Sequence, residues 1–144
     1  MATIINIETS TSSCSLSLAS DGKILFAACE PSGMNHAKLL GGYAKEAENV
    51  LKEKNLHLDA VCVSKGPGSY TGLRIGVSMA KGLCFGAGAK LLAVDTLALI
   101  AHTAIKSGAV ASDALVCPMI DARRMEVYAS FFDTKLGQVR ATSA

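Results

Sequence analysis

A glycine-rich joint at residues 64–76 constrains the fold of this chain more than any other segment. It reads SKGPGSYTGLRIG, and an apolar run of β type at 60–63 leads into it. Gly66 and Gly68 allow the backbone to turn, since glycine accepts dihedral angles that other residues avoid. A helical run at 77–85 follows. A strand that passes through a tight loop into a helix predicts an α/β fold.

Such joints often bind phosphate, because free N–H groups and the helix dipole favour an anion. Two features of the sequence argue against a nucleotide loop here. Lys65 precedes the glycines, whereas the lysine of a P-loop follows them, and the glycine spacing is not that of a dinucleotide-binding loop. A structural turn is therefore favoured, and a phosphate site at Gly66, Gly68 and Ser69 is the alternative. Ser69 or Thr71 is expected to cap the helix.

Apolar alternation, helical spacing and turn signals predict the order βββαβαβα. The elements are expected as strands at 3–9, 14–19 and 24–29, a helix around 40–51, a strand at 59–64, the joint and its helix, a strand at 90–94, and a helix from Asp95 or Thr96 to about 106. They form a first lobe over residues 1–110.

The opening of this pattern recurs in the last part of the chain. Strands are expected at 115–120 and 125–132, with a polar corner at 121–124 and a turn at 133–137. When Glu8 is aligned with Asp121, the turn at 21–22 falls close to the turn at 133–137. Residues 111–144 are therefore interpreted as the opening strands of a second, incomplete lobe, and the chain as a truncated form of a longer, two-lobed protein.

Composition excludes several classes of function. The net charge is only +2 and Lys and Arg form no run, so a large nucleic-acid-binding face is not expected. The five cysteines include no C-x-x-C pair, which argues against a zinc site or a redox pair. We expect a cytoplasmic protein, because no secretion signal or membrane-spanning segment is evident.

A strip of small residues runs along the helix after the joint. Gly72, Gly76 and Ala80 recur every four residues. Because glycine inside a helix costs about 1 kcal/mol relative to alanine, the strip requires close approach of another backbone. That backbone belongs either to the chain's own sheet or to another subunit, and the residues alone do not decide between them.

Three segments together resemble the TsaB family, also called YeaZ. They are residues 4–11 (IINIETST), 64–83 and 119–128 (MIDARRMEVY), in the order found in that family. TsaB is a bacterial subunit of the machinery that makes threonylcarbamoyladenosine in tRNA. The resemblance covers essentially the whole chain and implies the actin, heat-shock chaperone and sugar-kinase-like (ribonuclease H-like) superfold.

The resemblance implies a non-catalytic scaffold without catalytic residues or a cofactor of its own. Its expected partners are a TsaD-like catalytic paralogue, a TsaE-like ATPase and a second copy of itself, with tRNA contacted only indirectly and ATP or ADP bound only in the complex. The resemblance favours a subunit contact for the small-residue strip. The contact surface is expected to comprise Tyr43, Ala47, Gly72, Arg74, Gly76, Ala80 and Lys81.

The alternative is an ATP-binding phosphotransferase or hydrolase of the same superfold. Glu8 and Ser10 stand where phosphate-binding relatives place an acidic corner, but the usual glycine is missing, so a capped β-corner is favoured. Arg123 and Arg124 in the second corner could bind an acidic partner or a phosphate, or pair with Glu126. No metal site is expected, since the catalytic paralogue uses two histidines one helical turn apart and the residue four after His36 is a leucine.

Overall fold

The computed structural model describes residues 2–32 and 35–144, which fall into two compact units. The elements in chain order are β1 (Thr3–Glu8), β2 (Cys14–Ser20), β3 (Lys23–Glu30), α1 (His36–Glu53), β4 (Ala60–Ser64), α2 (Tyr70–Ala87), β5 (Lys90–Val94), α3 (Thr96–Lys106), β6 (Met119–Arg123), β7 (Glu126–Phe132) and β8 (Gln138–Ser143). This order confirms the expected βββαβαβα pattern and the α/β class.

The first unit, residues up to 65 and 69–93, contains a five-stranded sheet in the order β3-β2-β1-β4-β5. β1 pairs antiparallel with β2 and parallel with β4, so Ile5 lies opposite Leu18 on one side and Val61 on the other. The β2–β3 hairpin turns at Asp21 and Gly22, which both have positive φ angles. This pairing makes β1 the central strand.

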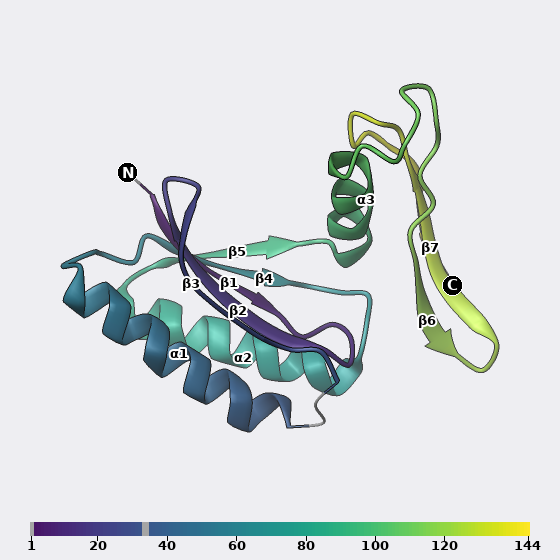
Figure 1. Ribbon diagram of the computed structural model, residues 1–144. Coiled ribbons are helices and arrows are strands. Elements are labelled where there is room, and N and C mark those ends of the chain that lie inside the picture. Colours follow the sequence, from purple (N-terminus) through teal and green to yellow (C-terminus); the bar gives the residue numbers. More distant parts are fainter. Residues whose placement is uncertain (1, 33–34) are drawn as a thin grey trace. The chain divides into compact units, whose positions relative to one another are not determined.

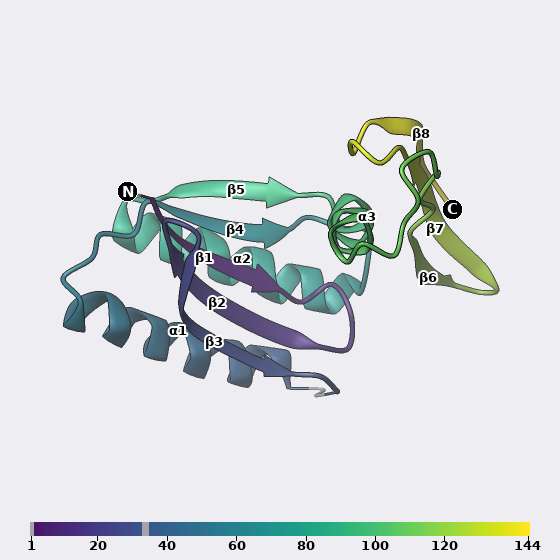
Figure 2. The ribbon, with the colours of Figure 1, turned by 45° about the horizontal axis from the view of Figure 1, so that its top comes forward.

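Helices α1 and α2 lie side by side over one face of that sheet (Figures 1 and 2). Strand alternation directs one set of side chains into the core beneath them. Apolar residues of α1 meet these strand side chains in the core. The buried residues include Ile5, Ile7, Leu16, Leu18 and Val63 from the strands and Leu40, Ala44, Ala47 and Leu51 from α1. The helical spacing of the α1 residues explains why one stripe of that helix is buried.

The second unit consists of residues 66–68 and 94–144. Asp95 caps α3, because its Oδ1 accepts a hydrogen bond from the N–H of Ala98 at 3.0 Å. α3 packs on β7 through Leu97, Ala101 and Phe132, and β7 is the central strand of the three-stranded sheet β6-β7-β8. The N–H of Thr96 donates to the carbonyl of Gly66.

Three details differ from the sequence-based expectations. α3 groups with the second unit, although it was expected as the last element of the lobe 1–110. The strand expected at 115–120 begins later, since β6 starts at Met119. Within 115–118, Val116 forms only an isolated bridge with Phe132. β8 was not expected, since its short sequence QVRATS is mainly polar, with Val139 as its one large apolar residue, and every residue in it is exposed. No helix in the described residues is long and apolar enough to cross a membrane.

Candidate functional site

The acidic corner lies where β1 and β4 end and α2 begins. One carboxylate oxygen of Glu8 accepts from the N–H of Ser10 at 2.6 Å, and the other accepts from the hydroxyl of Ser64. The carbonyl of Ser10 accepts from the N–H of Ser69 at 2.6 Å. The Ser69 hydroxyl in turn accepts from the N–H of Gly72 at 3.3 Å and caps α2. The structure therefore brings Glu8, Ser10 and Ser69 together.

These residues do not fit a nucleotide phosphate. Both oxygens of Glu8 already accept hydrogen bonds from the chain, and the carboxylate adds a negative charge at the corner where an anion would lie. The hydroxyl of Ser69 is used as a helix cap. Gly66 and Gly68 have φ angles of 111° and 155°, which supports their interpretation as turn residues.

The small-residue strip packs against the chain's own sheet. A Cβ atom added to Gly72 would overlap the carbonyl oxygen of Thr9, and one added to Gly76 would overlap the Thr9 hydroxyl. Ala80 continues the same buried face of α2. Of the two alternatives, the structure therefore supports close packing within the chain.

This packing corrects part of the expected contact surface. Gly72, Gly76 and Ala80 lie on the buried face of α2, and Ala47 of α1 is 0% exposed, so these four residues present no exposed surface to a partner while the fold is intact. Tyr43 is half-buried and packs against the same core. Other residues of the expected surface, Arg74 and Lys81, are exposed on the opposite side of α2.

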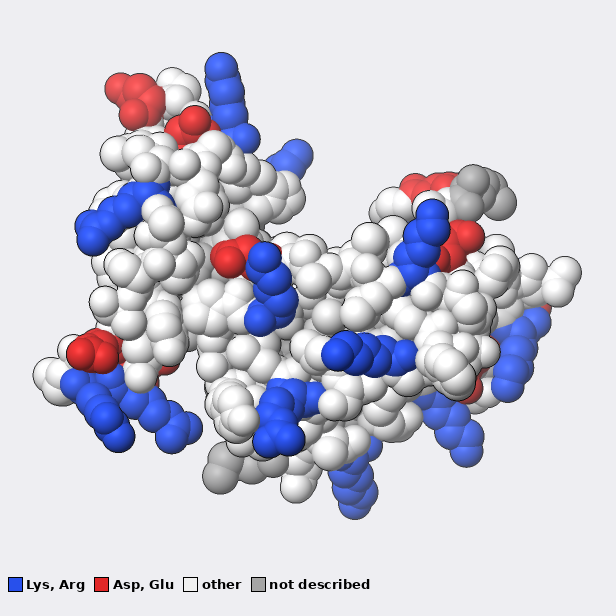
Figure 3. Space-filling model, turned by 180° about the vertical axis from the view of Figure 1, so that it is seen from behind, with Lys and Arg blue, Asp and Glu red and all other residues white. Residues whose placement is uncertain are grey.

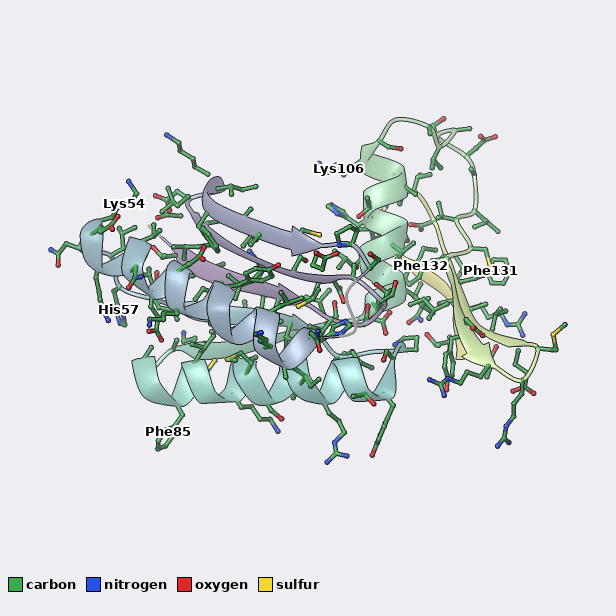
Figure 4. All side chains as sticks on the ribbon, turned by 60° about the horizontal axis from the view of Figure 1, so that its bottom comes forward. Lys54, His57, Phe85, Lys106, Phe131 and Phe132 are labelled. Atoms are coloured by element: carbon green, nitrogen blue, oxygen red, sulfur yellow. The ribbon has the colours of Figure 1, made fainter. Side chains whose placement is uncertain are left out.

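That opposite side is here called the outer face of α2 and consists of Tyr70, Arg74, Ser78, Lys81 and Phe85. Their spacing of three or four residues places them along one helix surface. Phe85 is 92% exposed and Tyr70 is 74% exposed, and Phe85 extends away from the helix body in Figure 4. The guanidinium of Arg74 lies 5.5 Å from the centre of the Tyr70 ring, within cation–π range.

Grooves between the two helices adjoin the outer face. One, of about 700 Å³, is lined by Ala37 of α1 and by α2 residues that include Arg74, Ser78, Met79 and Gly82. A second, of about 500 Å³, lies between the C-terminal halves of the helices and includes Leu56 and Leu83. Sequence reasoning missed Tyr70, Ser78 and Phe85, although their helical spacing with Arg74 was the signal that could have identified them.

Burial shifts the pKa of two thiols in the first unit. Burial raises the pKa of the Cys14 thiol, and the nearby Cys29 adds to the rise. Burial also raises the pKa of the Cys62 thiol, with a smaller contribution from the Glu8 carboxylate.

No cluster of metal-ligating side chains occurs in residues 2–32 and 35–144. His36 contacts the carbonyl of Thr11 through Nε2 at 3.1 Å.

The second polar corner forms the hairpin between β6 and β7. Arg123, Arg124 and Met125 have φ angles of 68°, 54° and 66°, which is unusual for three consecutive residues that are not glycine. The left-handed conformation costs such residues roughly 1–2 kcal/mol each. The suggested surface pairing of these arginines with Glu126 is not seen among the described residues, and the hydrogen bond found at this corner runs from the N–H of Arg123 to Oδ1 of Asp121 at 2.7 Å.

Comparisons with known proteins decide the family. The family model described as TsaD, tRNA N6-adenosine threonylcarbamoyltransferase, matches residues 30–142. The tRNA threonylcarbamoyladenosine biosynthesis protein TsaB of Escherichia coli is 34% identical over 126 residues, which is 87% of this chain and 52% of that protein. The structure of YeaZ from Pseudomonas aeruginosa superposes with a TM-score of 0.82 at 28% identity, over 99% of this chain and 67% of that one. The chain belongs to the TsaB (YeaZ) family.

A more distant likeness extends the fold assignment. The ROK hexokinase of Thermus thermophilus superposes with a TM-score of 0.52 at 11% identity, over 91% of this chain and 47% of that one. At that identity the likeness concerns the fold alone, and it places this TsaB-family chain in the actin and sugar-kinase-like superfold. The chain spans about half the length of its E. coli relative.

Proposed function

We propose that this chain supplies a non-catalytic partner subunit for a threonylcarbamoyltransferase of the TsaD type that acts on tRNA adenosine. The observation that carries the proposal is the outer face of α2, which holds exposed aromatic and basic side chains beside two interhelical grooves. The acidic corner supports it too, because the Glu8 carboxylate and the hydroxyls of Ser64 and Ser69 form hydrogen bonds within the chain.

The outer face defines the chemistry of its partner. Burying an exposed Phe side chain such as Phe85 contributes about 1.5–3 kcal/mol, which makes it a strong anchor in an interface. α2 contains no acidic residue, whereas Arg74 and Lys81 lie on this face. The partner surface is therefore an apolar helix face with carboxylates opposite these two cations.

Further parts of the assembly follow from the same proposal. A TsaE-like ATPase joins the pair, ATP or ADP binds only in that complex, and tRNA is contacted through the transferase. In the absence of the transferase, two copies of this protein pair through their outer faces. The transferase then displaces the second copy, because both would bind the same exposed side chains.

Reconstitution tests the proposed function. The transferase is assayed for transfer of threonylcarbamoyl to tRNA with and without the complete TsaB-family protein that contains this chain. The proposal expects that this protein alone transfers nothing and that its addition stimulates the transferase. Transfer by this protein alone would refute it, as would lack of stimulation. Calorimetry with ATP and magnesium checks the alternative, and saturable binding to the isolated protein would favour an ATP-using enzyme.

A further inference from the structure

β3 forms one edge of the five-stranded sheet (Figure 2). Its inner side pairs with β2, and no strand of the described residues pairs with its outer side. Folded proteins protect such an edge with a short strand, a proline or a charge in the middle of the strand. β3 is eight residues long, and residues 25–29 contain neither a proline nor a charge. This edge can therefore accept another strand.

A bulge in β3 determines which of its side chains share a face. Leu25 is an extra residue there, because two consecutive residues of β2 pair with Ile24 and Phe26. Without the bulge, Lys23 and Glu30 would point to opposite faces, since an odd number of steps separates them. With the bulge, both residues lie on the face of the sheet that the helices cover. The only two charges of β3 therefore stand at its two ends and on one face.

The sequence of β3 is complementary to itself in an antiparallel pairing. Around a two-fold axis at Ala27, each residue meets one on the same face of a second copy, and Leu25 stays outside the pairing, as it does in the pairing with β2. Lys23 then lies opposite Glu30 of the second copy, and symmetry forms this pair of opposite charges twice. The remaining facing pairs each combine a larger with a smaller side chain, namely Ile24 with Cys29 and Phe26 with Ala28.

These charges favour a second copy over other occupants of the edge. The opposite edge strand, β5, reads KLLAV, so Lys90 would face no carboxylate if that strand paired with itself. A nucleic-acid strand requires an excess of positive charge, whereas β3 carries one charge of each sign. On the face shown in Figure 3, the Lys and Arg side chains are likewise interspersed with uncharged and acidic surface.

We propose that two copies of this protein pair through the outer edges of β3 and join their five-stranded sheets into one continuous sheet. Main-chain hydrogen bonds between the strands supply the affinity, and the two Lys23–Glu30 pairs set the register. α1 contacts β3, whereas α2 contacts β1 and β4. The edge is therefore a different surface from the outer face of α2, and the pairing does not rest on the proposed function.

Site-specific cross-linking tests the two-fold axis. Facing residues of an antiparallel pair have Cα atoms about 4.5 or 5.5 Å apart, which a disulfide can span. Because Ala27 is exposed, the complete TsaB-family protein with Ala27→Cys and Cys29→Ser should keep its fold and form a covalent dimer on mild oxidation. The matched control is Ala93→Cys with Cys29→Ser, which changes an exposed alanine of β5 and should stay monomeric on a non-reducing gel. No covalent dimer from Ala27→Cys, or equal amounts from both variants, would overturn the pairing.

An exchange of charges tests the register. Lys23→Glu places two carboxylates opposite each other at both ends, so the dissociation constant of the pair should rise about tenfold or more. Lys23→Glu with Glu30→Lys restores opposite charges and should return the dissociation constant close to its starting value. Sedimentation equilibrium measures both variants in a Phe85→Ser background, which weakens pairing through the outer face of α2. Equal weakening in the single and double variants would overturn the proposal, and so would an unchanged dissociation constant in Lys23→Glu.

Neither experiment contains the transferase. Failure of the proposed function would therefore leave the cross-link and the charge rescue unchanged, and failure of the β3 pairing would leave stimulation of the transferase unchanged.

Discussion

The close packing of α2 on β1 predicts opposite effects for two glycine-to-alanine changes in the same helix. A Cβ at Gly72 would overlap the backbone carbonyl oxygen of Thr9, whereas nothing lies within 4 Å of a Cβ at Gly82. Both residues lie inside α2, so both changes gain the same intrinsic helix propensity. Gly72→Ala should therefore destabilise the protein and Gly82→Ala should stabilise it.

The magnitudes follow from these two terms. Alanine is favoured over glycine in a helix by about 1 kcal/mol, which is the whole expected effect at Gly82. Overpacking costs about 3 kcal/mol where a backbone atom must move, so Gly72→Ala should lose about 2 kcal/mol net. The two variants should then differ by about 3 kcal/mol, or about 12 to 24 °C in Tm at 4 to 8 °C per kcal/mol for a unit of this size.

Thermal and urea unfolding of the two single variants measures this difference. A third measurement uses Gly76, where the obstacle is the Thr9 hydroxyl rather than backbone. This hydroxyl is buried without a hydrogen-bond partner in the described residues, so Thr9→Ala should rescue Gly76→Ala but not Gly72→Ala. Equal stability of Gly72→Ala and Gly82→Ala would refute the proposed packing, as would rescue of both glycine variants by Thr9→Ala.

Two further predictions concern a helix cap and the thiols. Asp95→Ala removes the cap of α3 and should lower the free energy of unfolding by about 1 kcal/mol, while Asp95→Asn should keep most of it; equal losses in urea unfolding would contradict the capping role. Because burial raises the pKa of Cys14 and Cys62, these two thiols form the reactive thiolate less readily, so the exposed Cys29 should react before either of them with Ellman's reagent. Equal rates for these three thiols would be inconsistent with the burial of Cys14 and the partial burial of Cys62.

Most of the first unit could be predicted because local signals and tertiary packing agree there. The alternation of residues 14–19 and the turn at Asp21-Gly22 each specify their element without reference to the rest of the chain. The cap at Ser69 could be predicted for the same reason. β8 could not, since a short, fully exposed strand is held mainly by pairing with β7 and carries little pattern of its own.

The candidate site was harder to predict because periodicity does not reveal what a helix face packs against. Gly72, Gly76 and Ala80 correctly indicated a close backbone approach, but only the structure identifies Thr9 as the neighbour of the glycines. Ala47 has the helical spacing of a contact residue and of a core residue alike, and it is a core residue. The exposed Phe85 was overlooked since an apolar residue in an apolar run gives no sign of its exposure.

The affinity of the complete TsaB-family protein for its TsaD-type transferase tests the central claim most directly. Calorimetry should compare the wild type with Phe85→Ser, which removes an exposed ring from the outer face, and with Val139→Ser, which removes an exposed apolar side chain from β8. A loss of about 1.5–3 kcal/mol corresponds to about 10- to 150-fold weaker binding for Phe85→Ser. Val139→Ser should bind like the wild type. Wild-type affinity in Phe85→Ser, with its fold intact, would contradict docking through the outer face of α2.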